Sequence, residues 1–346
     1  MMNKNISRKE GFNEKIVFID GLPGCGKTLF SKLVSSFDRV EKLNYAYEIE
    51  NLCQLKYFEK ISTDAISAMI RFSKDLILYN SMMSREVNFR PSDLSSIFHH
   101  HNTIKYIKRA FEKGDFAVPS KIEKEKPILP LTVHNLLCIS DPIFETLGDD
   151  AVFIEIVRHP LYMIIQQTLN FQKLVYTARD FSLYIEHNNN ELPWYTYGWE
   201  DQFVNSNSVE KAIYFIEKIG EQMKNARIRL REKYNANILT IPFENFVLEP
   251  DSYMFQIESI IGSKITNITK RELKKQNVPR VKIADGISLD VYKRCGWTPP
   301  VKGLSEKEEL NLRREFVKNS ASLEAIIVLE NLCKEYEESY LQNFIN

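Results

Sequence analysis

The feature that most limits how this chain can fold is a glycine-rich loop directly after a short apolar run. Residues 15–20, Lys-Ile-Val-Phe-Ile-Asp, are mostly apolar and predict a buried strand. The next residues, Gly21-Leu-Pro-Gly-Cys-Gly-Lys-Thr28, match the phosphate-loop pattern G-x-x-x-x-G-K-S/T at every fixed position. From Thr28 onward the apolar spacing becomes helical. Strand, glycine loop and helix in this order predict an α/β domain built on a parallel sheet.

The residue types in this loop suit an anionic ligand. Average residue frequencies would give the four fixed positions by accident in about one chain in a hundred of this length. Glycines let backbone N–H groups turn toward a phosphate, and the following helix adds its positive end. Lys27 supplies a full charge, and Thr28 would coordinate magnesium if the ligand were a nucleoside triphosphate. We expect a phosphate group to be bound by Gly21, Pro23, Gly24, Cys25, Gly26, Lys27 and Thr28.

Further strands and helices alternate along the chain. Residues 128–133, 151–157 and 235–241 are candidate strands, and residues 209–233 form a helical stretch with a basic end. Strands that alternate with helices predict a doubly wound, mostly parallel sheet.

Two longer stretches are helical in pattern. Residues 45–116 contain almost no glycine or proline and predict a mostly helical insertion beside the sheet. Residues 305–343 predict a helical C-terminal segment. We therefore interpret residues 1–346 as a single P-loop domain with these two additions.

Composition excludes several classes of protein. Lysine plus arginine and aspartate plus glutamate both number 46, so no overall charge attracts the chain to nucleic acid or to an anionic membrane. The polar first fifteen residues lack the apolar core of a signal peptide, and no later apolar run approaches the ~20 residues of a membrane span. The five cysteines are scattered and form no CxxC pair. We expect a cytoplasmic protein without a nucleic-acid or membrane partner, and the oligomeric state stays open.

A second polar sequence follows the candidate strand at residues 151–157. Arg158-His-Pro160 stands between this strand and an apolar helical stretch. Proline is favourable in the first turn of a helix, and the carboxyl end of a strand is where open α/β sheets bind ligands. Arg158 is therefore either an anion ligand or one partner of a surface ion pair.

Taken together, these motifs resemble the P-loop sulfotransferase superfamily, whose members use 3′-phosphoadenylyl sulfate. The resemblance covers the phosphate loop and residues 127–262. Arg158-His-Pro160 is similar to the family's Arg-x-Pro motif, and Thr132-Val-His134 is similar to its Lys-Thr-His strand end. Glu244 and the later Glu249-Pro250 pair also look like the family's turn after a strand.

The resemblance implies a sulfotransferase that moves a sulfuryl group from 3′-phosphoadenylyl sulfate to a hydroxyl or amine of a small molecule or glycan. Lys27 would stabilise charge on the leaving phosphate, and Arg158 would hold the donor's 3′-phosphate. Gln166 stands where the family commonly has a serine for the same phosphate. His134 would be the general base, because a neutral imidazole near pH 7 can accept the proton of an attacking hydroxyl.

Some residues depart from the family pattern and keep two alternatives open. The family's usual loop lysine falls on Gly24, whereas Lys27 stands where an ATP-dependent kinase has it. A P-loop kinase using ATP or GTP with Mg²⁺ is therefore the second hypothesis, and a nucleotide-binding regulator without turnover is the third. A kinase needs a further magnesium ligand, for which Asp20, Glu155 and Glu244 are imperfect candidates. We predict no dedicated metal site.

Three other features have both a functional and a structural interpretation. Arg85 and Arg90 could hold an anionic acceptor, or they could flank a capped helix end. His134 could be a base or a hydrogen-bonded residue at the end of a strand. The aromatic cluster at residues 194–199 could stack on a sugar, although packing in the core is the favoured interpretation.

Overall fold

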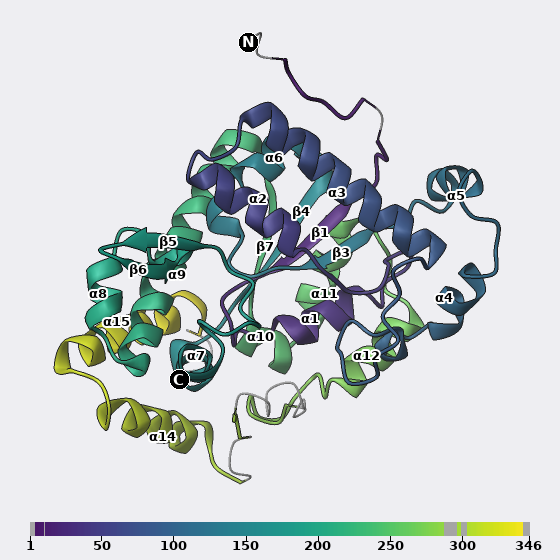
Figure 1. The fold of residues 1–346 in the computed structure, drawn as a ribbon. Coiled ribbons are helices and arrows are strands. Elements are labelled where there is room, and N and C mark those ends of the chain that lie inside the picture. Colours follow the sequence, from purple (N-terminus) through teal and green to yellow (C-terminus); the bar gives the residue numbers. More distant parts are fainter. Residues whose placement is uncertain (1–3, 10, 287–295, 299–302, 342–346) are drawn as a thin grey trace.

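A five-stranded parallel sheet forms the centre of the computed structural model, which describes residues 4–9, 11–286, 296–298 and 303–341 (Figure 1). The strand order is β2-β3-β1-β4-β7, and every neighbouring pair is parallel. The strand bounds are Ile16–Asp20 (β1), Asn44–Tyr45 (β2), Leu129–Thr132 (β3), Ala151–Val157 (β4) and Asn237–Pro242 (β7). The α/β fold class predicted from the sequence is confirmed.

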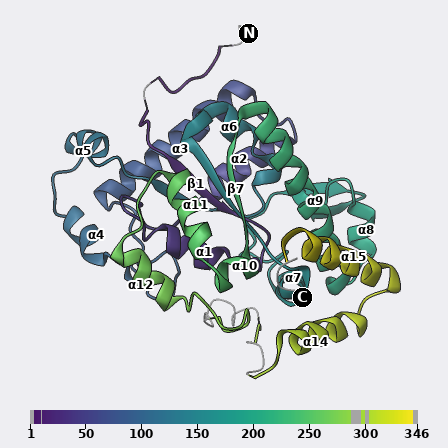
Figure 2. The same cartoon turned by 180° about the vertical axis from the view of Figure 1, so that it is seen from behind.

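Helices cover both faces of this sheet, which explains why β1 and β4 are almost continuously apolar (Figures 1 and 2). One face carries α1 (Lys27–Val34), α10 (Phe243–Leu248), α11 (Asp251–Ile261) and α12 (Asn267–Lys275). The other carries α2 (Tyr47–Tyr57), α3 (Thr63–Met83) and α6 (Asp141–Leu147). The long helix α9 (Ser208–Tyr234) contacts β7 and α6, and α7 (Pro160–Lys173) packs on α9.

The order of the strands determines where a ligand can bind. β1 lies in the middle of the sheet, with β3 on one side of it and β4 on the other. Because all three strands are parallel, the chain leaves them at the same edge of the sheet. The glycine loop follows β1, His134 follows β3 and Arg158 follows β4. The three sequence motifs are thus brought to neighbouring strand ends, at the point where open α/β sheets bind ligands.

Helices occupy most of the two stretches that the sequence predicts to be additions. The first contains α2, α3, the 3-10 turn at Ile97–His99 and α4 (Thr103–Arg109), and α5 (Ala117–Glu125) follows. The C-terminal stretch contains α14 (Glu306–Lys318) and α15 (Leu323–Tyr340); residues 342 and 343 of the predicted segment lie outside the described residues. In the part of the chain that the structure describes, no helix has both the length and the apolar character needed to cross a membrane.

The sequence pattern misses two pieces of β structure. β2 is only two residues long and therefore too short to show alternation. A separate antiparallel hairpin pairs β5 (Tyr184–His187) with β6 (Asn190–Pro193). Its turn residues, Asn188 and Asn189, both have positive φ (49° and 62°), a conformation that asparagine tolerates in tight hairpin turns. The hairpin leads into the 3-10 turn Trp194–Thr196 and into α8 (Glu200–Asn205).

Candidate functional site

The phosphate loop folds around its own lysine. The Lys27 ammonium donates to the Gly21 carbonyl at 2.5 Å and to the Leu22 carbonyl at 3.2 Å, and Lys27 is only 8% exposed. Thr28 lies half-buried in the first turn of α1. Cys25 is buried, and this burial raises the pKa of its thiol. The lysine charge is therefore held within the loop, where backbone N–H groups and the start of α1 also favour an anion.

Two glycines in the loop have a positive φ that favours glycine, and at Gly26 a close neighbour also excludes a side chain. Gly26 has φ 105°, and a Cβ there would lie 2.3 Å from the ring of Phe243. Gly24 has φ 90°, and a Cβ there would lie 3.5 Å from Oε1 of Gln166. Gln166, predicted as a phosphate ligand, thus lies against the loop, and Phe243 packs directly on it.

Asp20 ends β1 and connects the loop to the chain beyond β3. It is completely buried, and its carboxylate accepts hydrogen bonds from the backbone N–H groups of Gly21 and Leu137, each at 2.7 Å. Burial raises its pKa to about 6, against the opposing effects of Lys27 and the two N–H groups. Both carboxylate oxygens are engaged in holding the loop.

Arg158 extends from the end of β4 onto the loop. Its Nη1 donates to the Gly24 carbonyl at 2.8 Å, and its Nε lies 3.8 Å from a carboxylate oxygen of Glu244. The guanidinium lies 4.3 Å from the ring centre of Phe243 and 5.1 Å from that of Tyr162. Nε is buried and makes no hydrogen bond to the described residues. Arg158 is therefore a cation beside the phosphate loop, and its ion-pair partner Glu244 is buried.

A second arginine, which the sequence analysis does not predict, faces the same ring. The guanidinium of Arg280 lies 5.4 Å from the ring centre of Phe243. Burial and the nearby Arg158 lower the pKa of Arg280 to about 10. Within the described ranges, no carboxylate lies at ion-pair distance from Arg280, whose side chain instead donates to the carbonyls of Asn277 and Ile283. No motif surrounds Arg280, so the sequence offers no signal for it.

Two cations on one aromatic ring form an anion-binding surface. The positive charges of Arg158 and Arg280 repel each other, and a bound dianion would remove that repulsion. Because Phe243 also packs on Gly26, this surface is continuous with the phosphate loop. The site thus offers two neighbouring positions for negatively charged groups.

His134 lies on the other side of the loop, two residues beyond β3. Its Nδ1 and its backbone N–H both lie 3.2 Å from Oε1 of Glu50, which comes from α2. The imidazole stacks near Tyr45 and Tyr47, and its side chain is 35% exposed. The carboxylate places the proton on Nδ1, which leaves Nε2 as the basic nitrogen.

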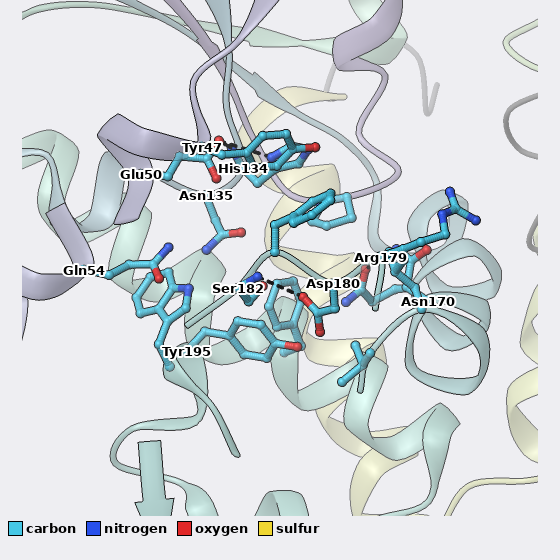
Figure 3. A pocket seen from close by; sticks show the side chains of 17 residues that line it. Tyr47, Glu50, Gln54, His134, Asn135, Asn170, Arg179, Asp180, Ser182 and Tyr195 are labelled. Atoms are coloured by element: carbon cyan, nitrogen blue, oxygen red, sulfur yellow. Dashed lines mark hydrogen bonds and ion pairs between the residues drawn. The ribbon is translucent and has the colours of Figure 1, made fainter. Parts of the chain in front are cut away.

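A cavity of about 150 Å³ joins this histidine to the loop (Figure 3). Pro23 and His134 line it at one end, and Gln54, Trp194 and Tyr195 line it deeper. The segment before the hairpin lines the cavity with Asp180 and Ser182, which Figure 3 shows facing Tyr195. Sequence analysis predicts His134 and Pro23 but not the carboxamides of the cavity, because isolated Asn and Gln residues carry no pattern.

The two candidate acceptor ligands from the insertion do not join this group. Arg85 is half-exposed, lies 3.5 Å from Asp115 and covers the ring of Tyr79. Arg90 is exposed, and its Nε donates to Ser92 at 3.3 Å. Neither lines the cavity at His134. Their role as acceptor ligands stays a prediction that this arrangement does not favour.

The carboxylates considered as magnesium ligands are all engaged by protein groups. Glu155 pairs with Arg227 at 2.6 Å and accepts from Thr240 at 2.7 Å. Glu244 accepts from the hydroxyl of Tyr336 at 2.5 Å and from the backbone N–H of His159 at 3.2 Å. Both contacts of Glu155 go to its Oε2, whereas both oxygens of Asp20 and both oxygens of Glu244 accept hydrogen bonds from protein donors. Within the described residues, no group of three or more His, Cys, Asp or Glu side chains could hold a metal.

The fold and this site define an α/β protein with a phosphate-loop motif, two arginines beside it and an adjoining cavity. No protein-family model matches the chain, and no curated protein matches it. Solved structures do match. They include sulfotransferase STF1 from Mycobacterium tuberculosis H37Rv, with 12% identity over 82% of this chain and 76% of that one, at a TM-score of 0.38.

Two further matches are similar in kind. The sulfotransferase domain from the curacin biosynthetic pathway is 12% identical over 88% of this chain and 98% of that one, at a TM-score of 0.42. Mouse sulfotransferase SULT7A1 complexed with PAP is 8% identical over 92% of this chain and 89% of that one, at a TM-score of 0.36. All three are sulfotransferases, the family that the sequence motifs resemble. Because these TM-scores are below 0.5, we base the function on this chain's own residues.

Proposed function

We propose that the protein is a sulfotransferase that moves a sulfuryl group from 3′-phosphoadenylyl sulfate to a hydroxyl or amine of a small molecule or glycan. The observation that carries this proposal is the pair Arg158 and Arg280 beside the phosphate loop. A donor with phosphates at both its 5′ and 3′ positions has one group for the loop and one for the arginines. ATP has no 3′-phosphate and would leave the two arginines facing each other.

The residues divide the chemistry between them. Lys27 and the loop N–H groups stabilise the 5′-phosphate as it leaves, and Arg158, Arg280 and Gln166 hold the 3′-phosphate. As the acceptor oxygen forms its bond to sulfur, the bond from sulfur to the phosphate oxygen breaks and its electron pair leaves with the phosphate. The acceptor proton passes to Nε2 of His134, and Glu50 stabilises the resulting imidazolium.

A kinase is the second candidate function, favoured by the position of Lys27 and Thr28. It requires a carboxylate that can hold magnesium near the transferred phosphate. Both oxygens of Asp20 and of Glu244 are engaged by protein donors, which speaks against these two carboxylates as magnesium ligands.

Binding of 3′-phosphoadenosine 5′-phosphate and of adenosine 5′-phosphate tests the proposal. Calorimetry should show the bisphosphate binding at least tenfold more tightly in the wild-type protein. Arg158→Ala should remove most of this preference, and so should Arg280→Gln. The exposed Arg90→Ala is the matched control and should leave both affinities unchanged. Equal affinities for the two ligands, or tighter binding of ATP that requires magnesium, would support the kinase instead.

A further inference from the structure

We propose that the cavity beside His134 takes a neutral, polyhydroxylated acceptor of about one sugar ring. This inference rests on the sulfotransferase function proposed above and specifies its acceptor. The observations that carry it are the size of the cavity, the chemistry of its wall and the engagement of its two carboxylates by neighbouring protein groups.

The volume limits the acceptor to one ring. The cavity measures about 150 Å³. An apolar cavity of that size in another protein holds benzene. A six-membered ring with its substituents therefore matches the space, and a fused multi-ring acceptor exceeds it.

The wall is rich in carboxamides, which pair well with hydroxyl groups. Gln54, Asn135, Gln167 and Asn170 all line the cavity, and the first three are almost completely buried. Gln54 uses its oxygen for the backbone N–H of Leu183 at 3.4 Å, so its NH₂ group is left for a ligand. A carboxamide offers one acceptor and two donors side by side, an arrangement that suits neighbouring hydroxyls on a ring.

Two polar groups of the wall have no partner within the protein. In the part of the chain that the structure describes, no hydrogen bond engages the carboxamide of Asn135 or the hydroxyl of Tyr195. Both line the cavity, and Figure 3 shows the Asn135 carboxamide below His134 and the Tyr195 ring beside Asp180. Burial raises the pKa of the Tyr195 hydroxyl well above its usual range, so this group stays neutral and able to donate. A hydroxylated ligand would satisfy both groups, whereas a plain aromatic ring would leave them unpaired.

Aromatic side chains form the rest of the wall, and they can also pack against a ligand that is not aromatic. Trp194, Phe215 and Phe181 line the cavity with Tyr47 and Tyr195. Such rings pack on the C–H faces of a sugar, while the carboxamides bond its hydroxyls. The same cavity thus offers both surfaces of an amphipathic ring.

The two carboxylates that line the cavity are already engaged by neighbouring protein groups. Glu50 is engaged by His134. Asp180 accepts from the backbone N–H of Ser182 at 3.0 Å and from the hydroxyl of Tyr184 at 2.5 Å. Arg179 is exposed and points away from the other labelled side chains in Figure 3. A neutral acceptor is therefore the best match, with the reacting hydroxyl at the His134 end.

The test compares single-ring acceptors in the full-length protein. Release of 3′-phosphoadenosine 5′-phosphate from 3′-phosphoadenylyl sulfate is measured with methyl glucoside, methyl galactoside, methyl mannoside, myo-inositol and phenol. We expect at least one glycoside or the inositol to accelerate release at least tenfold over buffer, and phenol to have little effect. Tyr195→Phe should raise the KM of that acceptor about tenfold while the affinity for 3′-phosphoadenosine 5′-phosphate stays unchanged.

Tyr197→Phe is the matched control, because Tyr197 is 54% exposed and does not line the cavity. Acceleration by phenol that exceeds every polyol, or a Tyr195→Phe variant with an unchanged KM, would overturn the inference. So would normal bisphosphate binding with no response to any polyol. Failure of the bisphosphate to bind at all would instead contradict the proposed sulfotransferase function, so the two failures are distinguishable.

Discussion

At the scale of single residues, His134 connects the loop, the cavity and a carboxylate. Its partner Glu50 is buried and lies at 3.2 Å from both the ring and the backbone N–H of the histidine. A histidine that served only to end a strand would need this contact for stability. A base would need it to direct Nε2 toward the acceptor. Removal of the ring should lower stability if His134 is structural, and should lower turnover if His134 is the base.

We predict that His134→Ala lowers turnover by about 10²- to 10⁴-fold and leaves the affinity for 3′-phosphoadenosine 5′-phosphate unchanged. The ring is one-third exposed, so its loss should change the melting temperature little. Kinetics with a glycoside acceptor and calorimetry with the bisphosphate give the two values. If the variant is destabilised but its folded fraction keeps full specific activity, His134 has a structural role only.

Asp20 predicts a measurable dependence of stability on pH. Its pKa is raised by burial from 3.8 to about 6, so the folded state holds a proton that the unfolded chain has already lost. Between about pH 4 and pH 6 the unfolded state therefore binds fewer protons, and stability falls as pH rises. For a shift of about 2 pKa units the loss approaches about 3 kcal/mol, complete above pH 6.

Comparison with Asp20→Asn isolates this effect, because the variant keeps the other titrating groups. Urea unfolding at several pH values from 4 to 7 gives the free energy of unfolding of both proteins. The wild-type value minus the variant value should decrease across this range. A difference that stays constant would mean that Asp20 is already ionised at pH 4.

At the scale of elements, the sequence predicts the strands and helices whose residue pattern can be recognised within one continuous stretch of the chain. β1, its glycine loop and α1 follow from the apolar run and the phosphate-loop motif. β4 and the start of α7 at Pro160 follow from a clear apolar strand and the favoured position of proline. The hairpin of β5 and β6 is not predicted, because its strands are short and lie largely at the surface. That hairpin leads directly to Trp194 and Tyr195, which the sequence marks as an aromatic cluster but does not place in a cavity with His134.

Helix α15 supports the anion site from behind. The hydroxyl of Tyr336 donates to Oε2 of Glu244 at 2.5 Å, and Oε1 of Glu244 faces Arg158 at 3.8 Å. On the same helix, Glu337 lies 3.1 Å from Nε2 of His159. The C-terminal helix thus holds the carboxylate that orients Arg158.

We predict that Tyr336→Phe lowers the free energy of unfolding by about 1 to 3 kcal/mol, because the buried Glu244 loses a donor. Affinity for 3′-phosphoadenosine 5′-phosphate should also fall, whereas affinity for adenosine 5′-phosphate should change less. Urea unfolding and calorimetry measure the two effects. Tyr253→Phe on α11 is the control, since its hydroxyl makes no hydrogen bond to the described residues. Equal effects of both substitutions would mean that Tyr336 on α15 does not position Arg158 through Glu244.

At the scale of the whole molecule, the sheet order brings together groups that are far apart in the sequence. The sequence predicts the loop, His134, Arg158 and Gln166, since each stands in or near a recognisable motif. It does not predict Arg280, which reaches Phe243 only through the packing of the chain beyond α12. Nor does it predict which acidic residues are already paired, because Glu155 meets Arg227 from a different element. Long-range packing decides both points.

The last prediction concerns how the molecule responds to its donor product. A ligand that binds only the folded state stabilises it by mass action, by about 2.7 kcal/mol at a concentration 100 times its dissociation constant. For a protein of this size we expect 3′-phosphoadenosine 5′-phosphate to raise the melting temperature by roughly 5 °C. ATP with magnesium at the same concentration should raise it much less, because ATP leaves the repulsion between Arg158 and Arg280 in place. Lys27→Met should abolish the shift, as the loop loses its charge. A larger shift with ATP and magnesium than with the bisphosphate would favour a kinase.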